Sequence, residues 1–529
     1  MKNKLLKYWY CYLLLITAFT PSFMAYNSAS DWLELGQIFI PFLLSISIIF
    51  IIFVSTWFLY KKHLVRTVNT TILLFLFLFL YRYIYIIFSD LAYTLSISSI
   101  LVHSFLIFFA IIFYILIYRE QKSVFFLGSL VHIIILPAIL YNIPKEAPID
   151  NNKATLSEIK LDKKISPDIF YTIPDCYSSN RIIQNTFNFD NNKFAEALES
   201  EGFYISDNSQ SNYLQTRLSL TSSLNLNYID KILNLNNSEN LQTIITHPAI
   251  ENNLIARSLK NIGYDIFHTK TTFPVGKLIG EEIKNNYADG QVMTVSNILL
   301  TYSIIGALNQ ENAAKTNFNT YDTVFESLAT FLQNNNSPDR KPLFVFSHLI
   351  LPHSPFLVNK DGNFIPPLSP EDIIADGGEK MLQRWRNDHP EKTDEYFFQY
   401  LKDGYINNVK FFNKRFLKLV SYLKENHNRP YIIVVQGDHG CSVLENEINT
   451  DLATNSKYLD DRSHILNAYY FFDKDYSNLS KDISPVNSFR VIFNQYFNAD
   501  LDKLEHKTLF STYDEPFKFQ KIPAYVNDN

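Results

Sequence analysis

Carboxylates and imidazoles follow three apolar runs of the sequence, each where the run ends: Asp175 after 168–174, His348 and His353 after 343–347, and Asp438 and His439 after 431–435. Their oxygen and nitrogen atoms are ligands for zinc and for divalent transition metals. If the runs are parallel strands of an α/β sheet, their carboxyl ends meet at one edge. The three runs together therefore predict a metal site, although one Asp-His pair alone would more often be an ordinary surface turn.

A hydroxyl that could act as a nucleophile stands at Thr216, where a polar loop passes into a predicted helix. The free N–H groups and the positive dipole end at the start of a helix favour anions. Coordination to a metal would lower the pKa of the hydroxyl and make it an alkoxide nucleophile. The alternative is that Thr216 only caps the helix.

The elements that must position these residues alternate between strands and helices. Predicted strands are Asp168–Ile173, Phe203–Ser206, Tyr264–Phe267, Pro342–Ser347 and Tyr431–Val435. Predicted helices include Lys193–Ser200, Asn253–Asn261, Tyr321–Gln333 and Tyr405–Glu425. Gly202 and Gly263 stand where the first two of these helices should end. This alternation predicts an α/β domain with a mostly parallel central sheet flanked by helices.

The N-terminal part of the chain has a different composition. Five apolar stretches, each of the roughly 17 to 25 residues that cross a bilayer, lie near 8–26, 38–60, 70–88, 95–118 and 124–143. Basic residues precede the first stretch and follow the second and fourth: Lys2, Lys4, Lys7, Lys61, Lys62, Arg66, Arg119 and Lys122. The positive-inside rule then places the N-terminus in the cytoplasm and the chain after the fifth stretch outside. The first stretch could instead be a cleaved signal sequence, with the same final orientation.

We therefore expect a bundle of five transmembrane helices over 1–145, a linker over 146–166 and an extracytoplasmic domain over 167–529. The length of 529 residues agrees with at least two structural units. A net charge of -5 and an aromatic content of 15% exclude the basic balance of nucleic-acid binders and the composition of disordered chains. We expect membrane lipids as partners of this chain, and we expect no nucleic-acid partner.

Four motifs occur in an order that resembles the sulfatase-like branch of the alkaline phosphatase superfamily: 167–175, 212–219, 348–353 and 436–440. A membrane part followed by an outward domain is also similar to lipoteichoic-acid synthases and lipid A phosphoethanolamine transferases. Through 466–470 and 485–490, the chain resembles most closely the sulfatase-like membrane proteins of bacteria. The resemblance implies an enzyme in the bacterial inner membrane.

Matching positions of these motifs carry the implied roles. The principal metal site would consist of Asp175, Thr216, Asp438 and His439, with Thr216 also the nucleophile. His348 and His353 would contact substrate phosphate or a second metal, outside the principal metal site. His464 is a looser candidate for the same role. Zinc and manganese both suit this ligand set.

The sequence departs from true sulfatases, which carry a C/S-x-P-x-R motif that no segment here matches. A threonine nucleophile instead indicates phosphorus chemistry on a phosphodiester or phospholipid headgroup. A phospho-threonine would then pass the group to an acceptor hydroxyl or to water. Two alternatives stay open: a sulfatase-like ester hydrolase with a membrane anchor, and a catalytically silent envelope protein.

Cys176 and Cys441 closely follow the metal-binding positions Asp175 and Asp438. If these two aspartates share one metal, the cysteines leave neighbouring strand ends. We therefore consider a disulfide at the rim of the site, with two free thiols as the alternative.

Overall fold

A computed structural model describes residues 10–11, 13–22, 39–94, 161, 166–233, 246, 249–269, 278, 303, 310–335, 337, 339–366, 385–386, 389, 391–442, 455–512 and 515–522. The chain divides into two compact units. One contains Met1–Glu146, Met293–Gln310 and Gln383–Lys392, and the other contains Ala147–Val292, Glu311–Leu382 and Thr393–Asn529.

The first unit contains the helices α2 (Phe39–Leu59) and α3 (Leu64–Thr94), which pack on each other. The hydroxyls of Thr56 and Thr71 lie 3.2 Å apart between them. Within the described residues, only α2 is long and apolar enough to cross a membrane. The predicted runs 95–118 and 124–143 lie outside the described residues, so the prediction of five spans is not confirmed.

The second unit is built on a six-stranded sheet in the order β2-β6-β5-β1-β4-β3. Its strands are β1 (Asp168–Pro174), β2 (Tyr204–Ile205), β3 (Asp265–His268), β4 (Leu343–Leu349), β5 (Tyr431–Gln436) and β6 (Asn467–Phe471). β1 pairs in parallel with β4 and β5, β3 pairs in parallel with β4, and β6 runs antiparallel to β5 and β2. The mostly parallel sheet is confirmed, whereas β6 was not predicted as a strand.

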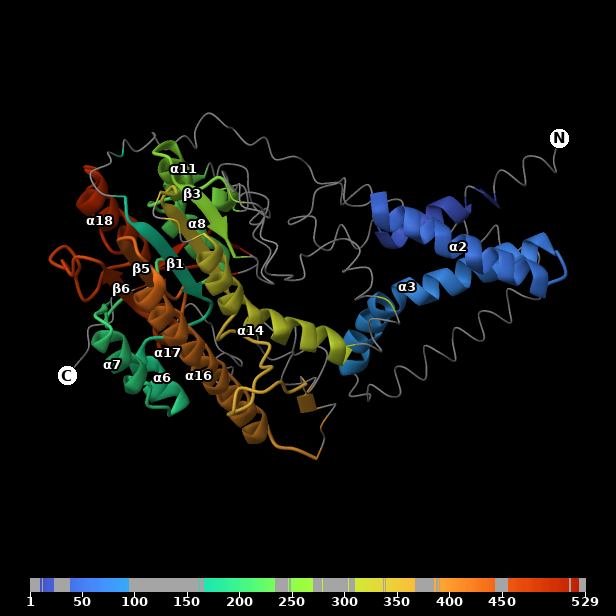
Figure 1. The fold of residues 1–529 in the computed structure, drawn as a ribbon. Helices are drawn as coiled ribbons and strands as arrows, with labels where there is room; N and C mark the ends of the chain where they lie inside the picture. Colours follow the sequence, from blue (N-terminus) through green and yellow to red (C-terminus); the bar gives the residue numbers. More distant parts are fainter. Residues whose placement is uncertain are drawn as a thin grey trace. The chain divides into compact units, whose positions relative to one another are not determined.

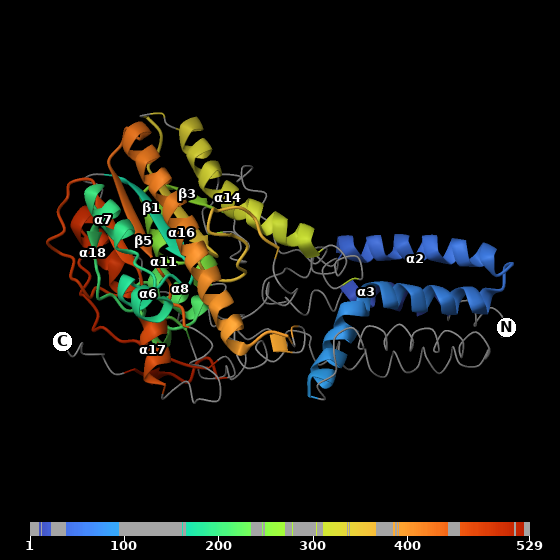
Figure 2. The same cartoon turned by 90° about the horizontal axis from the view of Figure 1, so that it is seen from below.

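Helices cover both faces of the sheet, as Figures 1 and 2 show. One face packs on α6 (Asn180–Phe187), α7 (Asn192–Ser200), α14 (Gln310–Asn334) and α16 (Asp394–Asn426). The other face packs on α8 (Thr216–Leu224), α11 (Leu254–Asn261) and α18 (Pro485–Phe497). The remaining elements are the helices α9 (Ile229–Ile232) and α17 (Ser456–Ser463) and the hairpin of β7 (Leu509–Phe510) with β8 (Gln520–Lys521).

The strands β1, β4 and β5 are buried along their whole length, because helices lie on both sides. Their register pairs Ile173 with His348 and Thr172 with Val435. The segments that follow β1, β4 and β5 therefore leave the sheet at the same edge. Gly202 and Gly263 have a φ of +89°, which agrees with their predicted place after a helix.

Candidate metal centre

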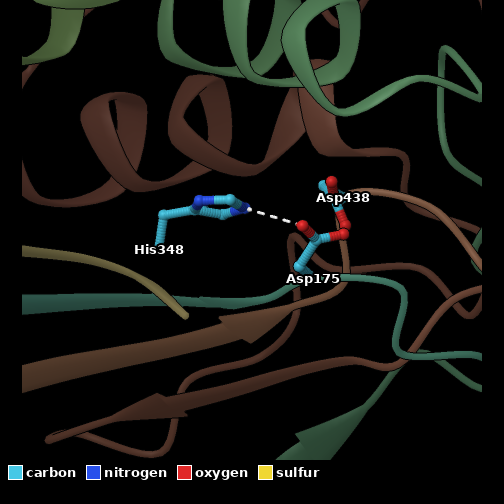
Figure 3. Close-up of side chains that lie close together, drawn as sticks. All are labelled: Asp175, His348 and Asp438. Atoms are coloured by element: carbon cyan, nitrogen blue, oxygen red, sulfur yellow. Dashed lines mark ion pairs between the residues drawn. The ribbon is translucent and has the colours of Figure 1, made fainter. Parts of the chain in front are cut away.

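The carboxylate of Asp175 lies between two imidazoles immediately after β1. Its Oδ2 is 3.7 Å from His348 Nε2, and its Oδ1 is 3.7 Å from His439 Nε2. Figure 3 shows the ring of His348 pointing at Asp175, with Asp438 beside them. Asp175, His348 and Asp438 are buried and each offers a ligand atom, and these atoms lie within 4.8 Å of one another.

The carboxylate of Asp438 is oriented by the main chain around it. Its Oδ1 accepts hydrogen bonds from the N–H groups of Cys176, at 3.0 Å, and His439, at 2.9 Å. Its Oδ2 is buried and accepts no hydrogen bond from the described residues. The main-chain oxygen of Asp438 accepts from the hydroxyl of Ser219 on α8 at 2.7 Å, which ties α8 to the end of β5.

The ring of His439 presents an unprotonated nitrogen to the centre of this group. Its Nδ1 lies 3.0 Å from the carbonyl oxygen of Gly440, and a carbonyl only accepts, so Nδ1 carries the proton. Nε2 then has its lone pair free to accept from Thr216 Oγ1 at 3.1 Å, and it lies 3.5 Å from Asp438 Oδ2. Burial, followed by the charge of Arg462, lowers the pKa of His439, so the ring is neutral at pH 7.

Thr216 is the first residue of α8, as the sequence predicts. The N-cap of this helix is Gln215, so the interpretation of Thr216 as a helix cap is wrong. The hydroxyl of Thr216 instead contacts His439, 223 residues further along the chain. A hydroxyl at the start of a helix lies beside N–H groups that have no partner within the helix.

His348 and His353 separate from each other in the structure. His348 is fully buried within the group, where burial lowers its pKa to about 4. His353 lies at the rim: its main-chain N–H donates to Asp175 O at 3.1 Å, and its Nδ1 donates to Ser354 O at 2.7 Å. Its Nε2 forms no hydrogen bond that we find among the described residues. The sequence treats the two histidines as a pair, but only His348 lies with the carboxylates.

His464 uses its two ring nitrogens within the protein. Nδ1 lies 3.0 Å from Asp460 Oδ1, and Nε2 lies 2.9 Å from Gln210 Nε2. Asp460 is in turn bound by Arg181 through hydrogen bonds of 2.8 Å and 2.7 Å. These contacts join α17 to its neighbours, and the role of His464 outside the principal metal site stays a prediction.

The disulfide between Cys176 and Cys441 is not formed, because both cysteines are free thiols. The thiol of Cys176 is directed at the carbonyl oxygen of Gly440, 3.4 Å away, and the thiol of Cys441 lies 3.8 Å from Ser442 O. Two free thiols were the alternative considered. Burial, followed by the neighbouring Cys441, raises the pKa of the Cys176 thiol well above its ordinary value.

Two residues near the group were missed by sequence reasoning. Asn408 on α16 is fully buried, and its side-chain amide donates to the carbonyl oxygen of His353 at 3.1 Å. Arg462, in the last turn of α17, donates to Leu214 O at 2.7 Å. Neither residue belongs to a recognisable motif, and their contacts join segments that are far apart in the sequence.

The residues present fit a divalent cation. In a tetrahedral site with bonds of about 2 Å, neighbouring ligand atoms lie about 3.3 Å apart. The separations from His439 Nε2 are 3.1 Å to Thr216, 3.5 Å to Asp438 and 3.7 Å to Asp175. A bound cation would also stabilise the two buried carboxylates, because burying like charges together is unfavourable.

Comparisons with known proteins give structural matches only. No family profile matches the sequence, and no curated protein matches it. One matching structure is the C-terminal periplasmic domain of phosphoethanolamine transferase EptC from Campylobacter jejuni, at 14% identity, covering 64% of this chain and 92% of that one with a TM-score of 0.36. Another is the integral membrane lipooligosaccharide phosphoethanolamine transferase A from Neisseria meningitidis, at 13% identity, covering 75% and 69% with a TM-score of 0.40.

A 2-O GAG sulfatase also matches, at 11% identity, covering 65% of this chain and 77% of that one with a TM-score of 0.37. The structures similar to this chain thus include phosphoethanolamine transferases and sulfatases.

Proposed function

We propose that this chain is a membrane-bound, metal-dependent enzyme that transfers or hydrolyses a phospho-group through Thr216. The observation that carries this proposal is the contact of 3.1 Å between Thr216 Oγ1 and His439 Nε2, at the start of a helix and beside two buried carboxylates. The elements that bring them together, β1, β5 and α8, are separate in sequence. A surface turn or a helix cap would not require this convergence.

The metal would be held by Asp175, Asp438, His439 and Thr216. His348 would lie beside these ligands. When bound, zinc or manganese would lower the pKa of the Thr216 hydroxyl and offset the charge on nonbridging phosphate oxygens. The two N–H groups that bind Asp438 Oδ1 hold this carboxylate in one orientation, so Oδ2 faces the centre before any ligand arrives.

Thr216 Oγ1 would attack the phosphorus of a phosphodiester. The Thr216 hydroxyl gives up its proton to solvent, the bond from Oγ1 to phosphorus forms, and the bond from phosphorus to the leaving oxygen breaks. The leaving alkoxide takes up one proton from solvent, so the step is balanced. In the second step an acceptor hydroxyl or water attacks the phospho-threonine and releases Thr216. His353, at the rim, would contact the phosphate or the leaving group through its Nε2.

A membrane-linked substrate follows from the apolar N-terminal part. The helix α2 exposes large apolar side chains along its length, among them Phe39, Phe50 and Phe58. We propose that several spans anchor the chain in a bacterial inner membrane, with the domain over 167–529 on the outer side. A phospholipid headgroup or a lipid-linked envelope phosphodiester would then lie within reach.

Turnover of bis(p-nitrophenyl) phosphate by the full chain in detergent tests the chemistry. We expect Thr216→Ala to lose at least about 10³-fold in kcat, because the covalent step has no nucleophile. Thr221→Ala is the matched control, since Thr221 is a buried threonine on the same helix whose Oγ1 forms no hydrogen bond among the described residues. Undiminished turnover in Thr216→Ala would overturn the proposed nucleophile.

A second assay separates transfer from hydrolysis. The chain would be incubated with a phospholipid labelled in its headgroup and with an acceptor alcohol. Label on the acceptor indicates transfer, and release of the labelled phospho-headgroup into water indicates hydrolysis. Retention of the label on the lipid, while bis(p-nitrophenyl) phosphate is cleaved, would exclude phospholipid as the substrate.

A further inference from the structure

We propose that Asn408 is a positioning residue for the phospho-transfer reaction: it fixes the main chain of 352–355 and, with it, the place of His353 at the rim. This inference rests on the proposed function, and no motif of the sequence points to Asn408. Asn408 would touch neither the metal nor the substrate. It would act through His353, whose ring would contact the phosphate or the leaving group.

The side-chain amide of Asn408 donates to the main chain of one short segment. Its Nδ2 lies 3.1 Å from His353 O, 3.3 Å from Pro352 O and 3.5 Å from Pro355 O. The two hydrogens of the amide are therefore shared among three carbonyl oxygens. Exchanging the amide nitrogen and oxygen would point an oxygen at all three carbonyls, so the orientation of this fully buried amide is determined by its surroundings.

The segment 352–355 needs a donor from another element because of its own sequence. The residues at its first and last positions are prolines, which have no N–H and cannot join it to a sheet. The N–H of His353 donates to Asp175 O at 3.1 Å, and the carbonyl oxygen of His353 accepts from Asn408. The main chain of His353 is thus held between a residue of the metal centre and α16.

The ring of His353 takes its orientation from the same segment. Its Nδ1 donates to Ser354 O at 2.7 Å, and Ser354 lies between residues whose carbonyl oxygens Asn408 binds. A shift of this main chain would therefore move the ring and its hydrogen-bond acceptor together. Misplacing a contact to the reacting group by about 1 Å can cost about 100-fold in rate.

The helix α16 is fixed against both segments that carry the site. Tyr405 lies one turn before Asn408 on the same face, and its hydroxyl donates to Cys176 O at 3.0 Å, just after β1. A Cβ at Gly404 would lie 2.5 Å from the side chain of Phe356, so a larger residue would push the helix and the segment after β4 apart. One face of α16 thus holds the chain after β1 and the chain after β4 in their relative places.

A double-mutant cycle tests whether Asn408 acts through His353. Turnover of bis(p-nitrophenyl) phosphate is measured with the metal-loaded full chain in detergent for Asn408→Ala, His353→Ala and the double variant. We expect each single variant to lose about 30- to 100-fold in kcat, with KM within about 3-fold of wild type and unchanged metal content. In the His353→Ala background, Asn408→Ala should cost no more than about 2-fold further. A merely structural residue would cost the same factor in both backgrounds.

A conservative variant and a matched control complete the test. Asn408→Ser keeps one hydroxyl donor and should recover part of the lost kcat. Asn487→Ala is the control, since Asn487 is a buried asparagine of α18 whose side chain bonds the main chain of Leu504 at 3.0 Å and 2.9 Å. Leu504 lies in a segment that carries no residue of the metal centre. Asn487→Ala should cost stability and leave kcat per folded chain within about 2-fold of wild type.

Failure of this inference differs from failure of the proposed function. A wild-type chain that binds no metal and leaves the diester intact contradicts the proposed function and, with it, this inference. An active wild-type chain, together with wild-type kcat in Asn408→Ala or in His353→Ala, contradicts only the role of Asn408. The same loss from Asn408→Ala with and without His353 also contradicts only that role.

Discussion

The two ends of β1 each carry a buried aspartate, but their environments are opposite. Asp168, at the start, forms an ion pair with Arg340 and accepts a hydrogen bond from His427 Nε2 at 2.7 Å, and Arg429 Nε lies 3.6 Å away. Asp175, just after the end, lies 3.7 Å from two imidazoles and shares its surroundings with a second buried carboxylate, Asp438. Asp168 is surrounded by side chains that supply counter-charge, whereas the imidazoles beside Asp175 are held neutral by burial.

The difference teaches which end is structural and which is built for a ligand. Burial alone would raise the pKa of Asp168, but hydrogen bonds from His427 and Arg340 and the charge of Arg340 hold it below its ordinary value. At the other end, burial keeps His348 neutral, with a pKa of about 4, so its ring supplies no positive charge at pH 7. We infer that an external cation completes that end.

The largest expected effect is on catalysis. Asp175→Asn should lower turnover of bis(p-nitrophenyl) phosphate by about 10³-fold, because a neutral amide is a poor metal ligand and the nucleophile would lose its activation. Asp265→Asn is the control, since Asp265 is a partly exposed aspartate at the start of β3 that pairs with Lys341 at 3.3 Å. If Asp175→Asn is as active as wild type, the proposed division between a structural Asp168 and a metal-binding Asp175 is wrong.

The same change at the other end should act on stability. Asp168→Asn leaves Arg340 and its neighbours without their buried counter-charge, and it should lower the free energy of unfolding by about 3 to 5 kcal/mol. Guanidinium unfolding followed by tryptophan fluorescence measures this. Asp265→Asn should change it by about 1 kcal/mol or less, because exposed pairs contribute little. If Asp168→Asn is as stable as its control, the cluster is not structural.

Acid should remove the contribution of Asp168 in a predictable direction. Its folded pKa is lower than in the unfolded chain, so its stabilisation is complete above about pH 4 and is lost as the pH falls through the folded value. Wild type should therefore lose stability more steeply than Asp168→Asn below about pH 4. Parallel curves of unfolding free energy against pH would contradict the assignment.

The smallest expected effect is on the stability of the metal-free chain, where removing a carboxylate of the metal centre should stabilise the fold. After metal removal with EDTA, Asp438→Asn should be about 1 kcal/mol more stable than wild type, because one of two buried like charges is gone. Asp168→Asn should remain less stable under the same conditions. Thermal unfolding of both variants in EDTA measures the two changes in stability. If both variants are destabilised by the same amount, the two ends of β1 do not differ in the way proposed.

Much of the fold follows from the sequence. The apolar runs of β1, β4 and β5 are buried on both faces, so they contain few polar interruptions and are easy to recognise. The strand β6 was not predicted, and it pairs in antiparallel orientation with β5 and β2 at one side of the sheet. The helices α14 and α16 begin earlier than the predicted Tyr321 and Tyr405, and α16 already buries Phe397 in its first turn.

The site was predictable where one strand end carries one ligand, as for Asp175 and Asp438. The sequence could not distinguish His348 from His353, since spacing alone does not show that one is buried while the other lies at the rim. It could not show that Asp460 and Gln210 engage His464, or that Arg462 lies beside Cys176. These arrangements depend on tertiary packing between distant segments.

The most direct test of the central claim is the metal content of the purified full chain after dialysis, measured by mass spectrometry. We expect about one zinc or manganese ion per chain in wild type and in Asp168→Asn, and less than about a tenth of that in Asp438→Asn. Refolding is not required, because all three proteins are compared as purified. A wild-type chain without metal, or equal metal in Asp438→Asn, would contradict the account.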